Sequence, residues 1–190
     1  MSGIINTTTV ESTNLQVSNI KDSTGTNTAM TVNSNGTMTP SKMCYSAFGL
    51  TGLHDATSAN AVITTWTLLN SAPYTTLGSA ITHSNGVFTF PHTGKFMITL
   101  NYEGYADGGA RPYAGGSIQY SSDSGANFTM QARGINSVYT NGAYLHTTCK
   151  VLLAITNVST QKVRFNDYVW SNFKVTNYNN GTMCTFEQIG

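Results

Sequence analysis

The chain has 190 residues with a formal net charge of +1, and only 9% of its residues are charged. This balance argues against a nucleic-acid binder that tracks phosphates, because such a protein needs a basic patch. Thr, Asn, Ser and Gly account for 85 residues, yet 39% of the chain is hydrophobic, which is too much for a disordered protein. Uncharged polar residues around an ordinary core, with few helix formers, predict an all-β protein.

Residues 1–42 contain no aromatic residue and are dense in Thr, Asn and Ser. The alternation of Met30 with Val32 predicts a short strand, and Ser34-Asn35-Gly36 predicts a hairpin turn after it. Such a segment cannot bury enough apolar surface alone to offset the entropy of ordering it. It is either a flexible tail or an arm that orders against other chains, and its spaced apolar residues favour an extended N-terminal arm. The residues expected to form the anchor interface of this arm are Ile4, Ile5, Val10, Leu15, Val17 and Ile20.

Residues 1–19 show no basic region and no apolar run as long as that of a signal peptide. No stretch of the chain approaches the roughly 20 apolar residues of a membrane helix. We therefore expect synthesis in a cytoplasm, no use of the usual secretory route and no membrane insertion. The three cysteines, Cys44, Cys149 and Cys184, are far apart and are expected to be buried thiols.

From Met43 onward the sequence has the turn signals of an antiparallel β domain. Asn-Gly pairs begin at Asn85, Asn141 and Asn180, and each favours a tight turn. About ten strands between the turns fit a two-sheet sandwich or jelly roll over residues 43–190. The predicted strands are 43–49, 61–69, 74–82, 86–90, 94–105, 113–121, 127–138, 143–156, 161–171 and 182–189.

Alternation within two of these strands predicts which side faces the core. In strand 94–105 one face carries Phe96, Ile98, Leu100 and Tyr102. In strand 143–156 one face carries Thr147, Cys149, Val151, Leu153 and Ile155. The sheet therefore has an apolar core side.

The stretch from Asn85 to Ile98 contains the most specific pattern in the chain. Asn85-Gly86 permits a tight turn with positive φ, and Phe88 is expected to point into the sandwich. Pro91 should end that strand because it cannot donate to a ladder, and Gly94 should let the backbone turn into the next strand. We interpret these residues as a fold motif and not as an active site. The motif comprises Gly86, Phe88, Pro91, Gly94, Phe96 and Ile98.

No pattern of catalytic or metal-binding residues stands out. The histidines are isolated from one another: His54, His83, His92 and His146. The chain lacks the paired Cys and His spacings of zinc sites. The members of a Ser/His/Asp triad come together only in the folded protein, and with 18 serines in the chain a serine is often near a histidine by chance. Asp107 and Asp123 could join backbone oxygens around a calcium ion, but we interpret both as turn formers. We therefore expect no enzymatic activity, no metal site and no cofactor.

Several tyrosines near a Gly-rich loop allow a second interpretation. They are Tyr102, Tyr105, Tyr113 and Tyr120. Exposed tyrosine offers an apolar face with a hydroxyl group, which suits carbohydrate or protein contacts. Alternatively, these side chains fill the core or a seam between subunits. If a ligand binds, we expect the loop 104–116, with Tyr105 and Tyr113, to face it.

The fold motif also resembles that of a known family. Gly86-Val-Phe88-Thr-Phe-Pro91-His-Thr-Gly94-Lys-Phe96-Met-Ile98 is similar to the head of complement component one subcomponent q, whose jelly roll is shared with tumour necrosis factor. Trp66 upstream and the stretch Thr185–Ile189 at the end extend the resemblance over residues 43–190. The resemblance implies a jelly-roll head that forms a homotrimer.

The N-terminal stretch resembles a leader found on structural proteins of tailed phages, where it precedes a head of this same type. The resemblance is carried by Leu15–Gly25 and Ala29–Thr37. Together the two resemblances imply a bacteriophage protein on the virion surface, with the major capsid protein or another virion protein as its partner. We expect a trimeric capsid decoration, either a cement or a head-fibre protein, held by its N-terminal arm.

Two other classes of function remain open. A tail-fibre head could bind a host surface receptor or glycan through Tyr105 and Tyr113, and an enzyme that degrades polysaccharide is the third class. The chain is short and lacks the repetitive shaft of a long fibre, which favours the capsid surface. No nucleic acid is expected as a partner.

Overall fold

The computed structural model describes residues 19–21, 28–32, 34–35, 38–40, 43–58, 60–170, 172–177 and 180–189. The chain divides into two units, Met1–Ser41 and Lys42–Gly190, which we call the N-terminal unit and the head domain. Five of the expected anchor residues, Ile4, Ile5, Val10, Leu15 and Val17, lie outside the described residues. The backbone of Ile20 is part of the first strand.

The N-terminal unit contains a small antiparallel sheet. β1 (Asn19–Lys21) pairs with β2 (Thr28–Val32), and β2 pairs with β3 (Met38–Pro40). Val32 lies opposite Met38, with Ser34 and Asn35 in the turn between them, so the predicted hairpin is confirmed. The described part of the predicted extended arm is therefore a meander of three short strands.

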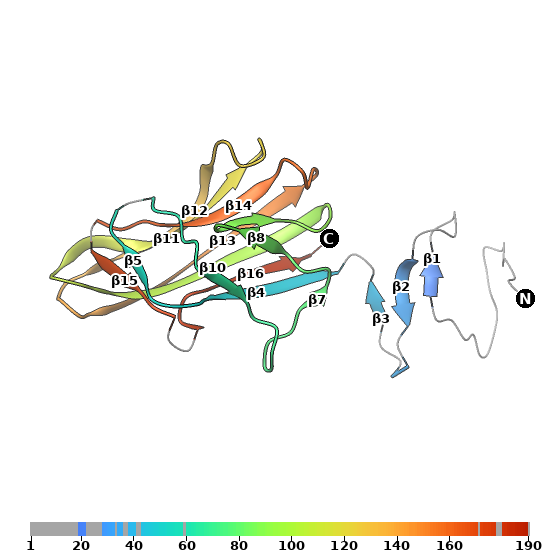
Figure 1. The fold of residues 1–190 in the computed structure, drawn as a ribbon, viewed down its shortest axis with the longest axis horizontal. Helices are drawn as coiled ribbons and strands as arrows, with labels where there is room; N and C mark the ends of the chain where they lie inside the picture. Colours follow the sequence, from blue (N-terminus) through green and yellow to red (C-terminus); the bar gives the residue numbers. More distant parts are fainter. Residues whose placement is uncertain are drawn as a thin grey trace, which may run out of the picture. The chain divides into compact units, whose positions relative to one another are not determined.

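The head domain is a sandwich of two antiparallel sheets, which confirms the predicted fold class (Figure 1). The strands of the first sheet are β4 (Cys44–Leu50), β5 (His54–Ala56), β6 (Trp66–Leu68), β7 (Leu77–Gly78), β10 (Gly94–Ala106), β13 (Tyr144–Ile155), β15 (Phe173–Val175) and β16 (Met183–Gln188). Their order is β5-β15-β10-β16-β4-β6, in which β15 and β16 pair with different stretches of the same edge of β10. β13 pairs with the other edge of β10, and β7 pairs with β4.

The second sheet contains five strands in the order β12-β11-β14-β9-β8. They are β8 (Thr82–Ser84), β9 (Val87–Thr89), β11 (Arg111–Ser121), β12 (Thr129–Val138) and β14 (Lys162–Asp167). Val62 adds an isolated bridge to Asn166 at the edge of β14. Among the described residues, no helix is long and apolar enough to cross a membrane.

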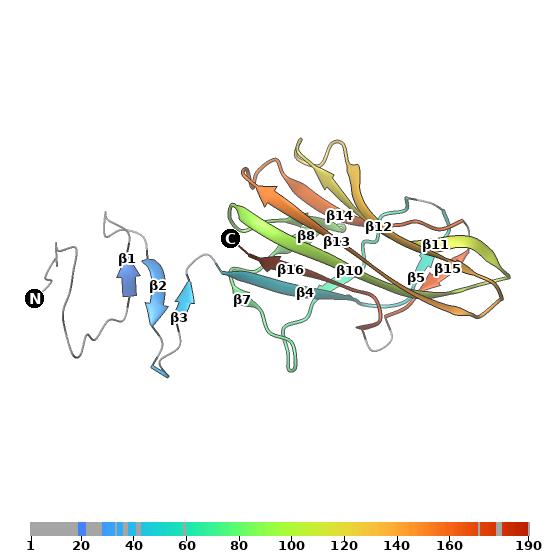
Figure 2. The same cartoon turned by 180° about the vertical axis from the view of Figure 1, so that it is seen from behind.

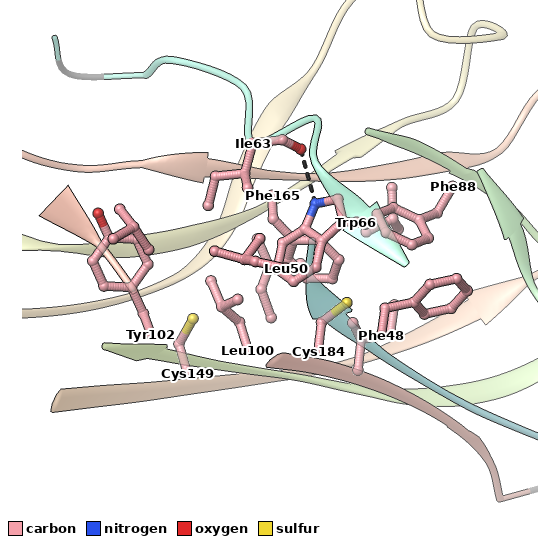
Figure 3. Packing of buried hydrophobic residues seen from close by; sticks show 14 of the residues in the cluster. Phe48, Leu50, Ile63, Trp66, Phe88, Leu100, Tyr102, Cys149, Phe165 and Cys184 are labelled. Carbon is pink, nitrogen blue, oxygen red and sulfur yellow. Dashed lines mark hydrogen bonds between the residues drawn. The ribbon is translucent and has the colours of Figure 1, made fainter. Parts of the chain in front are cut away.

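The core lies between the two sheets, and aromatic rings fill much of it (Figure 3). Phe88 makes edge-on ring contacts with Phe48 and Phe165, at centroid distances of 5.0 and 5.2 Å. The indole nitrogen of Trp66 donates to the carbonyl oxygen of Ile63 at 2.8 Å, so this buried polar atom is satisfied. Such packing of rings from both sheets fixes how the two layers meet.

The predicted faces of the long strands are confirmed. The inward side of β10 carries Phe96, Ile98, Leu100 and Tyr102, which are all at most 1% exposed. These residues lie opposite Leu153, Val151, Cys149 and Thr147 of β13 in the expected alternation. The three cysteines are buried free thiols, and burial raises the pKa of Cys149 to about 11.

Several predicted strand boundaries were wrong. The predicted strand 74–82 is interrupted, because Tyr74 is held in a turn to Ser71 and Gly78 has a φ of 65°. Within 61–69 only Trp66–Leu68 forms a strand, apart from the bridge at Val62. The short strands β5 and β15 were not predicted. They pair with each other at one end of the first sheet, where three residues are too few to show a period.

Candidate functional site

The residues of the predicted fold motif form part of the core and the turns next to it, and Gly94 also lines an open surface pocket with Thr93, Lys95 and residues 154–156. Phe88, Phe96 and Ile98 have no exposed surface. β9 ends at Thr89, two residues before Pro91, and β10 begins at Gly94. Gly86 has a φ of 76°, and a Cβ atom there would lie 2.3 Å from the carbonyl oxygen of Ile63. Only glycine fits this turn, since both its backbone angle and its contact exclude a side chain.

The predicted ligand-facing loop 104–116 is not a loop over most of its length. β10 continues to Ala106 and β11 begins at Arg111, so the connection consists of residues 107–110. Tyr105 and Tyr113 do not converge on one site. Tyr105 points out of the first sheet and contacts the ring of Tyr144 at 5.4 Å, whereas Tyr113 belongs to the second sheet. Tyr102 is buried in the core, as the alternative interpretation of the tyrosines expected.

A cluster of aromatic side chains with one arginine lies on the outer face of the second sheet. We call it the aromatic platform, and it consists of Tyr113, Tyr168, Trp170 and Arg133. The ring of Tyr113 lies 5.4 Å from that of Tyr168 and 5.8 Å from that of Trp170. The Arg133 guanidinium lies 4.9 Å above the ring of Tyr168 and donates to its hydroxyl at 2.9 Å. Trp170 is 61% exposed, which is unusual for so large an apolar side chain.

Backbone alternation after β14 explains why two of these aromatic residues face outward. Asp167 and Val169 are fully buried, so Tyr168 and Trp170 point to the other side. The amide of Tyr168 donates to the carbonyl of Gly115 at 2.8 Å, and the amide of Trp170 donates to the carbonyl of Tyr113 at 3.2 Å. These bonds continue the pairing of β14 with β11 and place the rings beside Tyr113.

A buried network of three polar side chains links the two sheets beneath the platform. The Asp167 carboxylate has no exposed surface and accepts hydrogen bonds from the Tyr102 hydroxyl at 2.9 Å and from His54 Nε2 at 2.7 Å. Burial, reinforced by the Asp167 charge, holds the pKa of Tyr102 well above its usual range. The bond to Asp167 raises the pKa of His54, since it favours the charged ring. Each carboxylate oxygen is paired within the network, so we interpret it as a structural link.

The outer face of the first sheet has an uncharged centre. We call it the β10–β16 face, and its centre consists of Met97, Thr99, Asn101, Met183 and Thr185. All five side chains are half-buried in the single chain. Charged residues surround this centre on the same strands and on β13: Lys95, Glu103, Glu187 and Lys150.

The acidic residues considered as calcium ligands lie apart. Asp107 precedes β11 and contacts Lys174 at 3.6 Å, within a polar pocket of about 60 Å³ that Asp55 also lines. Asp123 follows the other end of β11 and forms a turn, where hydrogen bonds from Ser121 and Asn127 lower its pKa to about 2. Within the described ranges, no three His, Cys, Asp or Glu side chains are grouped so that they could hold a metal ion.

Sequence reasoning identified one member of the platform and missed three. Tyr113 was proposed as ligand-facing, but Arg133, Tyr168 and Trp170 were not considered. The pattern Tyr168-Val169-Trp170 at the end of a predicted strand was a usable signal, because alternation places its two aromatic residues on the same face. The His54–Asp167 contact joins residues 113 positions apart and left no signal in the sequence.

No family model matches the sequence, and no curated protein shows significant sequence similarity to it. Solved structures nevertheless share its fold. Eiger TNF from S. frugiperda is 13% identical with a TM-score of 0.58, and the match covers 78% of this chain and 93% of that chain. Murine APRIL at pH 8.5 is 11% identical with a TM-score of 0.57, and the match covers 78% of this chain and all of that chain.

A complement protein also matches, but less well. The globular domain of the zebrafish complement 1qA protein is 12% identical, and the match covers 76% of this chain and 98% of that chain. Its TM-score of 0.43 is too low to support an argument. At these identities the likeness concerns the fold alone. The head domain therefore has the jelly-roll fold of tumour necrosis factor.

Proposed function

We propose that this chain is a non-enzymatic structural protein of a bacteriophage virion. In this proposal, three head domains associate around one axis and decorate the capsid surface. The N-terminal units attach the trimer to the major capsid protein or to another virion protein. The trimer is also what the family resemblance of the head implies.

The chemistry of the β10–β16 face is the observation that carries the proposal. Its centre is uncharged and contains two methionines, and charged residues lie around it. Copies of the chain can therefore pack through this face without removing charges from water, which is the main cost of burying ionic groups. Charged residues are depleted from the centre of a protein interface and occur at its rim, and this face has that arrangement.

The N-terminal unit supports the virion location. Its leader resembles those of tailed-phage structural proteins, and its spaced apolar residues suit strand addition to the edge of a sheet on another protein. Three such units on one trimer would strengthen attachment through effective concentration, without any new contact. The unit would then be sensitive to protease in the free protein and protected on the particle.

Antibody-labelled electron microscopy of the source particle tests the location. We expect label over the capsid, with a copy number near the icosahedral number of the shell. A chain that lacks residues 1–40 should still form its trimer but should no longer attach. Label confined to the tail would favour the tail-fibre alternative, and normal attachment of the shortened chain would make the head the anchor.

The aromatic platform favours one alternative, a tail-fibre head that recognises a host surface glycan. Trp170 and Tyr113 provide exposed apolar surface with polar groups beside it, which suits contact with a sugar. Under this alternative the same trimer would stand at the tail, and its head would contact the host.

A further inference from the structure

We propose that the aromatic platform binds an acidic saccharide, with the sugar carboxylate on Arg133 and the sugar ring against the indole of Trp170. The inference rests on the glycan-binding alternative and needs neither the trimer nor the anchor. The sequence placed a ligand at Tyr105 and Tyr113, which lie on different sheets. The aromatic platform instead lies on one sheet, and its side chains contact one another.

Trp170 offers the stacking surface. It is 61% exposed, although Tyr113 supports it with an interplanar angle of 88°. A perpendicular contact holds the indole while most of its surface remains open to a ligand. A sugar ring presents apolar C–H groups on its faces and hydroxyl groups on its edge, so it matches an aromatic ring with polar neighbours. The Tyr168 ring continues the surface toward Arg133.

The charge of Arg133 selects an acidic ligand. Within the described part of the chain no carboxylate pairs with this guanidinium, and β11, β12 and β14 contain one acidic residue, the buried Asp167. One of its N–H donors is used by Tyr168, and a guanidinium has five. A carboxylate can therefore bind in the two-pronged geometry that arginine favours.

The other three cations on the strands of this sheet, Arg111, Lys162 and Arg164, are already engaged. Lys162 donates to the Val158 carbonyl oxygen at 3.0 Å, and Arg164 donates to Gln119 at 2.8 Å while it lies 4.0 Å above the ring of Phe128. Arg133 is therefore the cation best placed to meet a ligand at the platform. A continuous positive track, which a long polyanion would need, is not part of this arrangement.

The platform is held by rigid structure. Strand pairing positions Tyr168 and Trp170, and the buried bonds of Asp167 to Tyr102 and His54 fix the backbone immediately before them. At the same end, Arg111 donates to the carbonyl oxygens of Asp107 and Asn172, which ties the 107–110 turn to the segment after Trp170. A site held in this way loses little entropy when a ligand binds.

The position of the platform also suits an outward-facing site. The chain enters the head domain at β4 and leaves it after β16, and both lie by the start of β10, where Ile189 donates to Lys95 (Figures 1 and 2). The segment after Trp170 lies at the other end of β10, where Asp107 donates to Asn172. Thirteen residues of strand separate these ends, which is about 40 Å. The platform is thus at the end of the head domain away from the point where the chain enters it.

The size of the platform argues against a protein partner. A stable protein interface uses about 20–30 residues on each side, whereas the platform consists of four side chains. Single-stranded nucleic acid also stacks on aromatic side chains, and it is therefore tested as a competitor.

The first step of the test uses the full-length chain and an array of oligosaccharides that contain uronic or sialic acids. Each oligosaccharide is paired with its counterpart in which the carboxylates are reduced to alcohols. The two tryptophans of the chain are Trp66, which is buried, and Trp170, so a ligand at the platform should change the fluorescence of Trp170. We expect a saturable change with at least one acidic oligosaccharide and weaker binding of its reduced counterpart.

Calorimetry with the best acidic oligosaccharide then locates the site. Arg133→Gln should weaken binding about tenfold, the loss expected for a hydrogen bond to a charged group, and should leave the reduced counterpart unaffected. Trp170→Ala should abolish binding of both. Tyr144→Ala removes an exposed ring from the outer face of the first sheet and should change nothing.

Several results would overturn the inference. Equal binding of the acidic and reduced oligosaccharides would contradict the proposed role of Arg133. The absence of binding across the whole array would contradict the proposed saccharide site. Tighter binding of a single-stranded oligonucleotide would make the platform a nucleic-acid surface. Light scattering on the same samples reports the trimer separately, so a failure of saccharide binding does not imply a failure of assembly.

Discussion

The Tyr102 hydroxyl donates a hydrogen bond of 2.9 Å to the buried carboxylate of Asp167, and this bond joins β10 of the first sheet to β14 of the second. A buried carboxylate without partners would be costly, so the bond fixes Asp167 toward the interior. Because strand residues alternate, the next side chain, Tyr168, must face outward. The buried network and the aromatic platform thus lie on opposite faces of the second sheet, at the end of β14.

The loss of the Tyr102 hydroxyl should destabilise the head domain. In Tyr102→Phe the ring can remain in the core, but one oxygen of Asp167 loses its donor. We expect the free energy of unfolding to fall by about 1–3 kcal/mol in denaturant titrations at fixed protein concentration. Tyr144→Phe, at an exposed ring, should change it by less than about 0.5 kcal/mol. Equal values for the two variants would mean that the buried bond contributes nothing.

The stability of the head domain should depend on the protonation of His54. The pKa of His54 is raised from 6.5 by its bond to Asp167, so the folded state favours the charged ring. This contribution is fully present below pH 6.5 and is lost as the pH rises through the higher folded value. The charge of Asp55, which lies on the same strand as His54, also raises the pKa of His54. Asp55 is itself paired with Lys174 of β15.

A comparison with His54→Gln isolates this effect from other titrations. The difference in unfolding free energy between the original chain and the variant should be larger at about pH 5.5 than at about pH 8.5. A difference that grew as the pH rose would reverse the assigned sign.

The face assignment of β10 can be tested at two neighbouring residues. Phe96 is fully buried, and Phe96→Ala should lower the free energy of unfolding by about 3–5 kcal/mol. Lys95, the preceding residue, is exposed on the opposite face, and Lys95→Ala should cost less than about 0.5 kcal/mol. If the two faces of β10 were exchanged, Lys95→Ala would be the more destabilising of the two substitutions.

Long strands with clear alternation were predictable from the sequence, whereas short strands and contacts between distant residues were not. Phe96, Ile98 and Leu100 follow each other at every second position, and turn signals bound their strand, so its inward face could be assigned before the structure was known. β5 and β15 contain three residues each, and their pairing depends on the rest of the fold.

The candidate site illustrates the same limit. Tyr113 and Arg133 belong to β11 and β12, and Tyr168 directly follows β14. Only the register of these three strands brings the residues together. Tyr105 was grouped with Tyr113 because the two are close in sequence, yet the chain passes from one sheet to the other between them. Proximity in sequence was therefore a poor guide to this surface.

A charge at the centre of the β10–β16 face should prevent self-association without unfolding the head domain. Thr99 lies in the middle of this face, between Lys150 of β13 and Thr185 of β16. Thr99→Arg should give a folded monomer, because packing copies together would bury an unpaired cation. Arg133→Glu changes charge on the other sheet and should leave assembly intact. The mass by light scattering and the circular dichroism spectrum distinguish loss of assembly from loss of fold.

The mass of the full-length chain in solution tests the central claim most directly. At micromolar concentration, light scattering should give three times the 20.3 kDa of one chain, and the value should persist on dilution to the lowest measurable concentration. Loss of this mass in Thr99→Arg would assign the contact between copies to the β10–β16 face. A stable particle of 20.3 kDa would contradict the claim, because that face would be open in the free protein and the head domain would have to act as a monomer.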